Sequence, residues 1–276
     1  MRFEGKCVVV TGASSGMGRR IALDFAKEGA TVVAVARRKE RLDEIAAEAE
    51  AFAGKILPYQ GDVSKEEVCN GMIDFAVEVC GKLDILVNNA GIMDEFVPIG
   101  DLKNEQFERV MAVNLYGPIY AMRKAVQVML EKETKGNIVN VASIGGVRGC
   151  RAGVAYTASK HAIVGATKNT AYMYAGNGIR CNVVCPGGVE TEVMNSQTNI
   201  SQFGIGRIMA GLDSSIPQGQ PEDISSAVLY IASEDAKFMT GAEIVIDGGV
   251  SCNSKINHKI KSKKTYFPEI RTCGKI

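Results

Sequence analysis

Seven short runs of apolar, mostly β-branched residues recur along the chain. They lie at Cys7–Val10, Thr31–Val35, Lys55–Tyr59, Leu83–Val87, Asn137–Val141, Ile179–Cys185 and Ala242–Ile246. Apolar residues dominate each run instead of alternating with polar positions, which predicts strands that are buried on both faces of a sheet.

Stretches with helical periodicity separate these runs. In the first, Met17, Ile21 and Phe25 follow at intervals of four residues, and the pattern ends at Gly29. Alternating strands and helices with short links predict βαβ units, a parallel sheet and right-handed crossovers. No change of composition divides this part of the chain, so we expect one doubly wound α/β domain over residues 1–251.

Two segments depart from this rhythm. Residues 192–216 are rich in Ser, Gly, Asn and Gln, which is typical of a lid over a functional site. Residues 252–276 hold seven basic residues and one acidic residue, leaving 25 basic and 30 acidic residues, a net charge of −5, in the rest. We expect a flexible, solvated tail. Docking of the tail into a neighbouring subunit and binding to an anionic surface are the alternatives.

Composition excludes several classes of protein. The net charge of +1 gives no electrostatic case for nucleic acid or for an anionic membrane. The only two histidines, His161 and His258, are isolated, and the eight cysteines form no C-x-x-C pair, so we expect no metal. No apolar stretch approaches the ~20 residues of a membrane span, and the first residues lead into a strand instead of a signal peptide. We therefore expect a cytoplasmic protein with reduced thiols and no membrane partner.

The segment Thr11-Gly-Ala-Ser-Ser-Gly-Met-Gly18 lies between the first strand and the first helix. Glycine at 12, 16 and 18 permits a tight turn that brings a pyrophosphate against backbone N–H groups at the positive end of a helix. A purely structural turn gives the same letters. The strand before and the helix after favour nucleotide binding.

The second strand ends in Ala36-Arg37-Arg38. Sites for NAD usually place an acidic residue here to bind the adenosine ribose, whereas an arginine suits the 2′-phosphate of NADP. The alternative is a basic helix start, although cations there oppose the helix dipole. We expect NADP(H) in preference to NAD(H).

Tyr156 and Lys160 are four residues apart and share one face of a predicted helix. A tyrosine with a pKa of about 10 is a poor base at neutral pH, and a nearby ammonium in a dry cleft lowers that pKa. The same spacing also occurs on solvated helix faces, so the pair gains meaning from the other motifs.

From Lys6 to Val250 the chain resembles the short-chain dehydrogenase/reductase family. The matching motifs, in the family's order and spacing, are Thr11–Gly18, Asp62-Val63, Asn88-Asn-Ala-Gly91, Asn114, Ser143, Tyr156-Thr-Ala-Ser-Lys160 and Pro186-Gly-Gly-Val-Glu-Thr191. The resemblance implies a seven-stranded Rossmann sheet of order 3-2-1-4-5-6-7, a nicotinamide cofactor and a homotetramer.

The resemblance also implies roles for single residues. Tyr156 would be the general acid or base, and Lys160 would lower its pKa and hold the nicotinamide ribose. Ser143 would stabilise the substrate oxygen, and Asn114, in the middle of an expected helix, would hold a water that relays protons. The cofactor would be bound by Gly12, Ser14, Ser15, Gly16, Met17, Gly18, Arg37, Arg38, Asp62, Val63, Asn89, Ala90, Gly91, Pro186, Gly187, Val189 and Thr191, together with Tyr156 and Lys160.

These features predict an NADP(H)-dependent oxidoreductase that interconverts a ketone and a secondary alcohol. Candidate substrate residues are Met93, Phe96, Ile144, Arg148, Val193 and Met194. Their apolar character favours a lipophilic substrate of hydroxysteroid or bile-acid type. A 3-oxoacyl thioester is the alternative, with Arg148 either meeting an anionic group or simply solvated. A catalytically silent nucleotide-sensing module is disfavoured by the intact motif residues, and an epimerase or dehydratase remains a third possibility.

Overall fold

The structure, a computed structural model, describes residues 1–193, 197, 199–212 and 215–252 of the chain. Seven parallel strands form one sheet in the order β3-β2-β1-β4-β5-β6-β7. They are β1 (Cys7–Thr11), β2 (Thr31–Ala36), β3 (Lys55–Gln60), β4 (Ile85–Asn88), β5 (Asn137–Val141), β6 (Arg180–Pro186) and β7 (Glu243–Ile246). The predicted doubly wound α/β fold and its strand order are confirmed.

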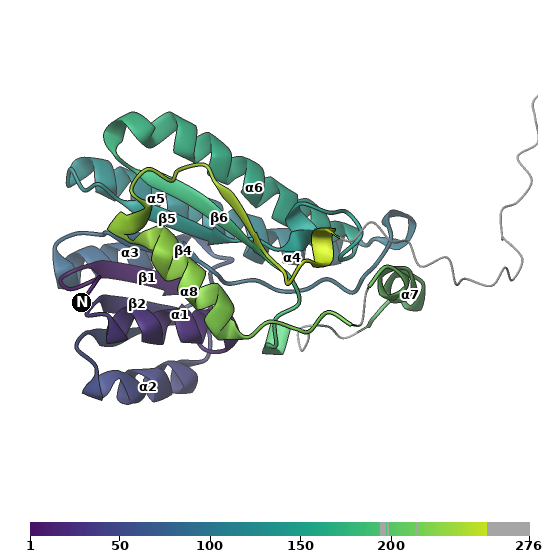
Figure 1. Cartoon of the computed structure of the whole chain (residues 1–276), viewed down its shortest axis with the longest axis horizontal. Helices are drawn as coiled ribbons and strands as arrows, with labels where there is room; N and C mark the ends of the chain where they lie inside the picture. The colour runs from purple at the N-terminus through teal and green to yellow at the C-terminus, as the bar shows by residue number, and fades with distance from the viewer. Residues whose placement is uncertain (194–196, 198, 213–214, 253–276) are drawn as a thin grey trace, which may run out of the picture.

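Helices cover both faces of the sheet (Figure 1). On one face pack α1 (Gly16–Lys27), α2 (Lys39–Glu48) and α8 (Pro221–Ala232); on the other pack α3 (Glu66–Cys80), α5 (Gly117–Glu131) and α6 (Val154–Tyr174). Side chains of each strand alternate between the two layers, so that Val8 and Val10 face α1 and Val9 faces α3. Helix α7 (Gln202–Ala210) lies beyond the carboxyl ends of the strands.

The two edge strands differ from the sequence prediction. The expectation of burial on both faces holds for β1, β2, β4, β5 and β6 but is wrong for β3 and β7, whose residues, Ile56 apart, are half-buried or exposed. An edge strand has a neighbour on one side only, and the helix layers do not reach across it. Val245 of β7 is 40% exposed as a result.

The chain direction across the sheet reverses between β1 and β4, which are neighbours. The loops that follow these strands diverge and leave a crevice at the carboxyl edge of the sheet, where α/β proteins of this type bind ligands. Gly12 begins the first loop with a positive φ of 70°, and a Cβ there would lie 2.8 Å from Asn89 Nδ2 and 2.9 Å from Ala90 Cα. Glycine is therefore required where the two loops touch.

Between α4 (Asn104–Met111) and α5, the helix widens into one π-helical turn, Ala112–Tyr116. Asn114 lies in this turn and is buried. The sequence predicted an ordinary helix at this position. Single π turns occur frequently at functional sites, because the wider turn redirects a side chain.

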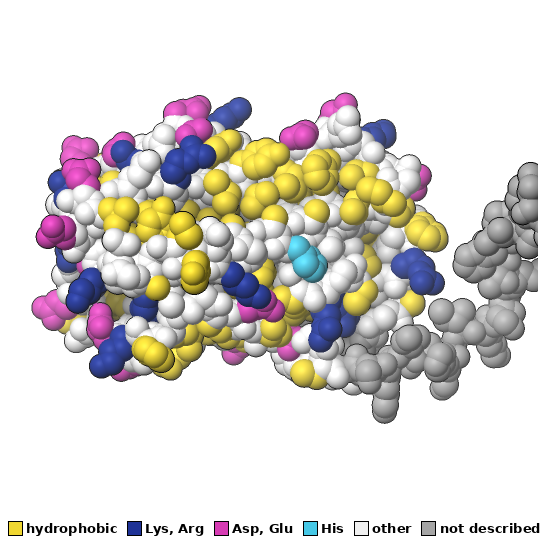
Figure 2. All heavy atoms as spheres, turned by 90° about the horizontal axis from the view of Figure 1, so that it is seen from above, with side chains coloured by type: hydrophobic (Ala, Val, Ile, Leu, Met, Phe, Trp, Pro, Cys, Tyr) yellow, Lys and Arg dark blue, Asp and Glu magenta, His cyan; other side chains and the backbone are white. Residues whose placement is uncertain are grey.

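Exposed apolar side chains gather on two outer surfaces. One comprises Leu130 of α5 with Tyr172 and Met173 of α6, and Figure 2 shows a band of hydrophobic side chains on this side of the molecule. The other, at the β7 edge, comprises Tyr230 of α8, Phe238 and Val245; Phe238 is fully exposed. Among the helices of the described residues, none has the length and apolarity to cross a membrane.

Candidate active site

A cleft of about 360 Å³ opens in the crevice between the β1 and β4 loops. Thirteen of the predicted cofactor residues line it: Gly12, Ser14, Ser15, Gly16, Met17, Arg37, Arg38, Asp62, Val63, Asn89, Ala90, Gly91 and Thr191. Its walls also include Val35, Ala36, Gly61, Ile92, Val113, Glu192 and Val193. Of these, Val193 was predicted to contact substrate, which stays a prediction; the structure places it in the wall of the dinucleotide cleft.

Six predicted cofactor residues do not line the cleft. Tyr156 and Lys160 lie beyond its end, and Gly18, Pro186, Gly187 and Val189 lie around it. Gly18 lies behind its wall, where a Cβ would collide with Asn89 Nδ2 and the carbonyl of Gly12. Gly187 continues from β6, and its N–H donates to the carbonyl of Ile246 at 2.8 Å. The latter four residues shape the backbone around the cleft instead of facing into it.

Thr11 holds the two loops of the cleft together. Its hydroxyl accepts hydrogen bonds from the N–H groups of Asn89 at 3.0 Å and Ala90 at 3.1 Å. The Asn89 amide in turn donates to the carbonyl of Thr11 at 3.0 Å. The glycine turn and the Asn88–Gly91 segment thus form one rigid wall.

The cleft fits a dinucleotide. Helix α1 begins at its rim with Ser15 as the N-cap, yet no side chain caps its N–H groups and no acidic residue lies in its first turn. These free N–H groups and the positive helix end suit a phosphate. The buried Oδ1 of Asn89 has no hydrogen-bond partner among the described residues, which leaves an acceptor for a ligand hydroxyl.

Arginines and one carboxylate surround the adenosine end of the cleft. Arg38 donates to Ser14 Oγ at 3.0 Å and Ser15 Oγ at 2.9 Å, and it pairs with Glu192 at 3.0 Å. Arg41 also pairs with Glu192, at 3.5 Å, and hydrogen bonding to Arg38 lowers the Glu192 pKa. Arg37 is exposed and makes no ion pair within the described part of the chain. Sequence reasoning missed Glu192, because its partners lie more than 150 positions away.

Ser143 and Tyr156 meet beyond the other end of the cleft and are not among the residues that line it. Ser143 follows β5 and caps a short helix, Ile144–Gly146, by accepting the N–H of Gly145 at 3.0 Å. Tyr156 lies in the first turn of α6 and forms a side-chain hydrogen bond with Ser143. A Cβ on Gly145 would lie 3.3 Å from the Tyr156 ring. The serine hydroxyl and the phenol therefore face the same space.

Lys160 and Asn114 lie close to Ser143 and Tyr156, next to Gly91. A Cβ built on Gly91 would lie 3.4 Å from both Lys160 Nζ and Asn114 Oδ1. The Asn114 amide donates to the carbonyl of Ile92 at 2.9 Å and its oxygen accepts the Ile92 N–H at 2.8 Å. The structure thus brings all four predicted catalytic residues close together just beyond one end of the cleft, next to Gly91.

Burial shifts the pKa values of Tyr156 and Lys160 in opposite directions. Burial raises the pKa of Tyr156 to about 12; the Ser143 hydrogen bond opposes this rise, and negative charge at Asp94 and Cys185 adds to it. Burial also lowers the pKa of Lys160 to about 8. That Lys160 lowers the Tyr156 pKa stays a prediction. Lys160 Nζ donates to the carbonyl of Val141 at 3.0 Å, 5.5 Å from the Tyr156 ring centre, and burial dominates.

The predicted substrate residues do not all lie together. Met93 and Phe96 form an apolar cluster with Ala152, Tyr156, Val193, Ile205 and Ile208. Ile144 is buried outside this cluster, and Arg148 is partly exposed, with a 3.4 Å hydrogen bond to the carbonyl of Ser251. Met194 lies outside the described residues. Helix α7 supplies Ile205 and Ile208, whose spacing of three was a helical signal within the predicted lid.

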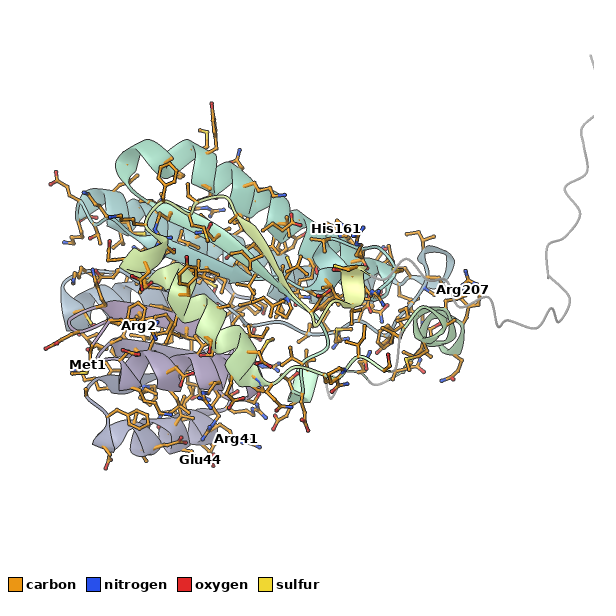
Figure 3. All side chains as sticks on the ribbon, in the orientation of Figure 1. Met1, Arg2, Arg41, Glu44, His161 and Arg207 are labelled. Atoms are coloured by element: carbon orange, nitrogen blue, oxygen red, sulfur yellow. The ribbon has the colours of Figure 1, made fainter. Side chains whose placement is uncertain are left out.

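His161, the only described histidine, lies exposed on α6 (Figure 3). Its Nδ1 is 2.9 Å from the carbonyl of Thr157, one turn earlier. It is exposed and bonded to its own helix, and among the described residues no hydrogen bond joins it to Ser143, as a hydrolytic triad requires.

A dinucleotide cleft at the switch point of a parallel sheet, with a serine, a tyrosine and a lysine at its end, defines a nicotinamide-dependent oxidoreductase site. Residues 12–251 match the family model described as "Enoyl-(Acyl carrier protein) reductase". The chain is 41% identical over 249 residues to "3beta-hydroxysteroid dehydrogenase 2" of Eggerthella lenta, covering 90% of this chain and 96% of that one. The chain belongs to the short-chain dehydrogenase/reductase family.

Further comparisons agree with this membership. The "3-oxoacyl-[acyl-carrier-protein] reductase FabG" of Thermotoga maritima is 37% identical over 256 residues, covering 91% of this chain and 99% of the relative. A solved short-chain dehydrogenase/reductase from Mycobacterium marinum superimposes with a TM-score of 0.82 at 34% identity, covering 91% and 97% of the two chains. The protein is thus an oxidoreductase of a family that uses a nicotinamide dinucleotide.

Proposed function

We propose that the protein interconverts a ketone and a secondary alcohol with NADP(H). The observation that carries the proposal is the convergence of Ser143, Tyr156 and Lys160 at the end of a cleft that fits a dinucleotide. When bound, the cofactor supplies or accepts the hydride. The protein supplies the proton: Tyr156 donates it to the carbonyl oxygen in reduction and accepts it in oxidation. Ser143 stabilises the charge that develops on that oxygen.

Substitution of the acid tests this proposal. We expect Tyr156→Phe to lower kcat/KM for ketone reduction by about 10²- to 10⁴-fold, the usual contribution of a general acid. NADPH affinity, measured by fluorescence titration, should change little. Tyr59→Phe, on β3 and outside both exposed apolar surfaces, is the matched control. A Tyr156→Phe enzyme with wild-type turnover would refute the mechanism, and turnover without net change in nicotinamide absorbance would indicate an epimerase or dehydratase.

The choice of NADP(H) rests on the adenosine end of the cleft. Ala36 offers no carboxylate to a ribose 2′-hydroxyl, and exposed Arg37 is available to a 2′-phosphate. Glu192 partly neutralises Arg38, so Arg37 is the stronger candidate. Wild-type kcat/KM should be higher with NADPH than with NADH, and an equal or inverted ratio would remove NADP(H) from the proposal.

The substrate that the site supports best is lipophilic, of hydroxysteroid or bile-acid type. The apolar cluster around Met93, Phe96 and Tyr156 supports it, as does similarity to relatives named 3beta-hydroxysteroid dehydrogenase. A 3-oxoacyl thioester is the second candidate, favoured by solvent-accessible Arg148 and by the Thermotoga maritima relative. Steroid ketones and acetoacetyl thioesters, assayed side by side with NADPH, distinguish the two.

We further propose that the protein is a homotetramer. A tetramer with three two-fold axes needs at least two different interfaces, each formed by one surface meeting its own copy. The two exposed apolar surfaces supply two such candidates. One of them includes β7, an edge strand of the sheet, and edge strands readily pair with another chain.

A further inference from the structure

Asp94 is a buried carboxylate that lies between the cleft and α6. Its side chain is completely buried, although it is ionisable. Oδ1 accepts the N–H of Phe96 at 3.0 Å and the N–H of Gly153 at 3.0 Å, and Oδ2 accepts the N–H of Tyr156 at 2.9 Å. Three backbone donors thus surround a carboxylate with no cation paired to it within the described part of the chain.

These bonds perform the work of a helix cap. The N-cap residue of α6 is Gly153, which has no side chain to bond the free N–H groups of the first turn. Tyr156 is the third residue of the helix, where an N-cap side chain normally bonds. A capping side chain at position 153 itself would not fit, because a Cβ on Gly153 would lie 2.5 Å from Asp94 Oδ2 and 2.7 Å from Val97 N. Asp94 therefore caps the helix from 59 positions away.

The same segment anchors the lid. The Ser201 N–H donates to the carbonyl of Glu95 at 2.9 Å, and the Gln197 amide donates to the carbonyl of Asp94 at 2.6 Å. Phe96, with a positive φ of 56°, is held in an unfavourable backbone conformation by its bond to Asp94. One short loop therefore contacts the catalytic helix on one side and the lid on the other.

We propose that Asp94 is a positioning residue for Tyr156, holding its backbone at the start of α6 and setting the charge that the phenol experiences. The inference rests on the proposed function, because it assigns Asp94 a part in the same proton transfer. The other groups that face the phenol are Ser143, through a hydrogen bond, Cys185 of β6, and Lys160. Asp94 is an added negative charge, and it opposes ionisation of Tyr156.

The test is Asp94→Asn, which keeps the shape and removes the charge. The amide nitrogen would then face an N–H group, so we expect kcat for ketone reduction to fall about 10- to 100-fold. Loss of the negative charge lowers the pKa of Tyr156. Because reduction needs the protonated phenol, the alkaline limb of the kcat profile moves to lower pH by at least half a unit. NADPH affinity stays within about twofold, since Asp94 does not line the cleft.

Glu95→Gln is the matched control, because it removes one negative charge from the neighbouring position. It should leave kcat and the pH profile unchanged. If Asp94→Asn folds poorly, Asp94→Ser offers a smaller neutral cap, and the same displaced alkaline limb is expected of it. A lower Tm with an unmoved pH profile in either variant would show a merely structural role and overturn the inference. The Tyr156→Phe variant tests the proposed function separately: full activity of that variant would refute the proposed function, independently of the results for the Asp94 variants.

Discussion

Lys160 shows how a single side chain in this site is tuned by burial. Its ammonium lies in the protein with 4% exposure, and its pKa falls to about 8. When the pKa of a group is lower in the folded than in the unfolded protein, protonation of that group favours the unfolded protein. The contribution of Lys160 to stability is therefore present above its unfolded pKa and lost as pH falls towards 8.

We expect this to appear in a comparison of wild-type with Lys160→Met. Between pH 7.5 and 9.5, the free energy of unfolding of the wild-type should rise relative to the variant by about 2 kcal/mol, from the pKa difference. Urea unfolding of the cofactor-free proteins at both pH values measures it. Buried cysteines with raised pKa values affect both proteins alike and cancel, except Cys185, whose pKa Lys160 lowers. A constant difference would show that Lys160 is not titrating in this window.

Functional residues that belong to a short sequence motif could be predicted from the sequence. Residues whose partners lie far away in the sequence could not. Gly12 and Gly16 were found because strand, turn and helix follow one another within a dozen positions. Glu192 and Asp94 gave no signal, because their partners at Arg38 and Tyr156 are far away in the sequence. An acidic residue in a loop is normally solvated, so only the packed structure shows which carboxylate is held.

At the scale of elements, hydrophobic runs predicted every strand within two residues, because a central parallel strand is apolar along its whole length. The same reasoning located β3 and β7 but wrongly predicted that they are buried. Burial of a strand depends on its position in the sheet and not on its own sequence. The π turn at Ala112–Tyr116 also had no sequence signal, because it differs from an α-helix by one residue in hydrogen-bond register.

Helix α7 offers a pair of matched glycines for testing the lid. A Cβ on Gly204 would collide with the carbonyl oxygen of Phe96, whereas a Cβ on Gly206 would meet nothing within 4 Å. We expect Gly204→Ala to push α7 away from the apolar cluster and to raise KM for the ketone about tenfold, with NADPH affinity unchanged. Gly206→Ala should leave KM unchanged and can raise stability slightly through helix propensity. Equal KM values for the two variants would argue against contact between α7 and the substrate.

At the scale of the whole molecule, the largest unexplained feature is the exposed apolar area. Phe238 is fully exposed beside the β7 edge, and Tyr172 is 83% exposed on α6. Scattered surface apolar residues are normal, but contiguous ones indicate association. The net charge of −5 outside residues 252–276 is too small to prevent copies of the chain from meeting.

Phe238→Asp tests the proposed tetramer. A carboxylate buried against its own copy across a two-fold axis is strongly unfavourable, so sedimentation velocity should show dimers in place of tetramers. Far-UV circular dichroism should be unchanged, because the side chain contributes nothing to the core of one protomer. Ile99→Asp, at a position 74% exposed but outside both surfaces, is the control. A Phe238→Asp tetramer would exclude the β7 edge as an interface.

The backbone hydrogen bond between Ser201 and Glu95, at the predicted lid, has a consequence for redesign. Ser201 holds the loop before α7 through its backbone N–H, and Glu95 accepts through its backbone carbonyl, so this joint does not depend on either side chain. Substitutions of Ile205 and Ile208, on the inward side of α7, therefore leave this backbone joint in place. Because both side chains belong to the apolar cluster that also includes Tyr156, a redesign of substrate range on the nine residues of α7 has to keep the packing around the phenol unchanged.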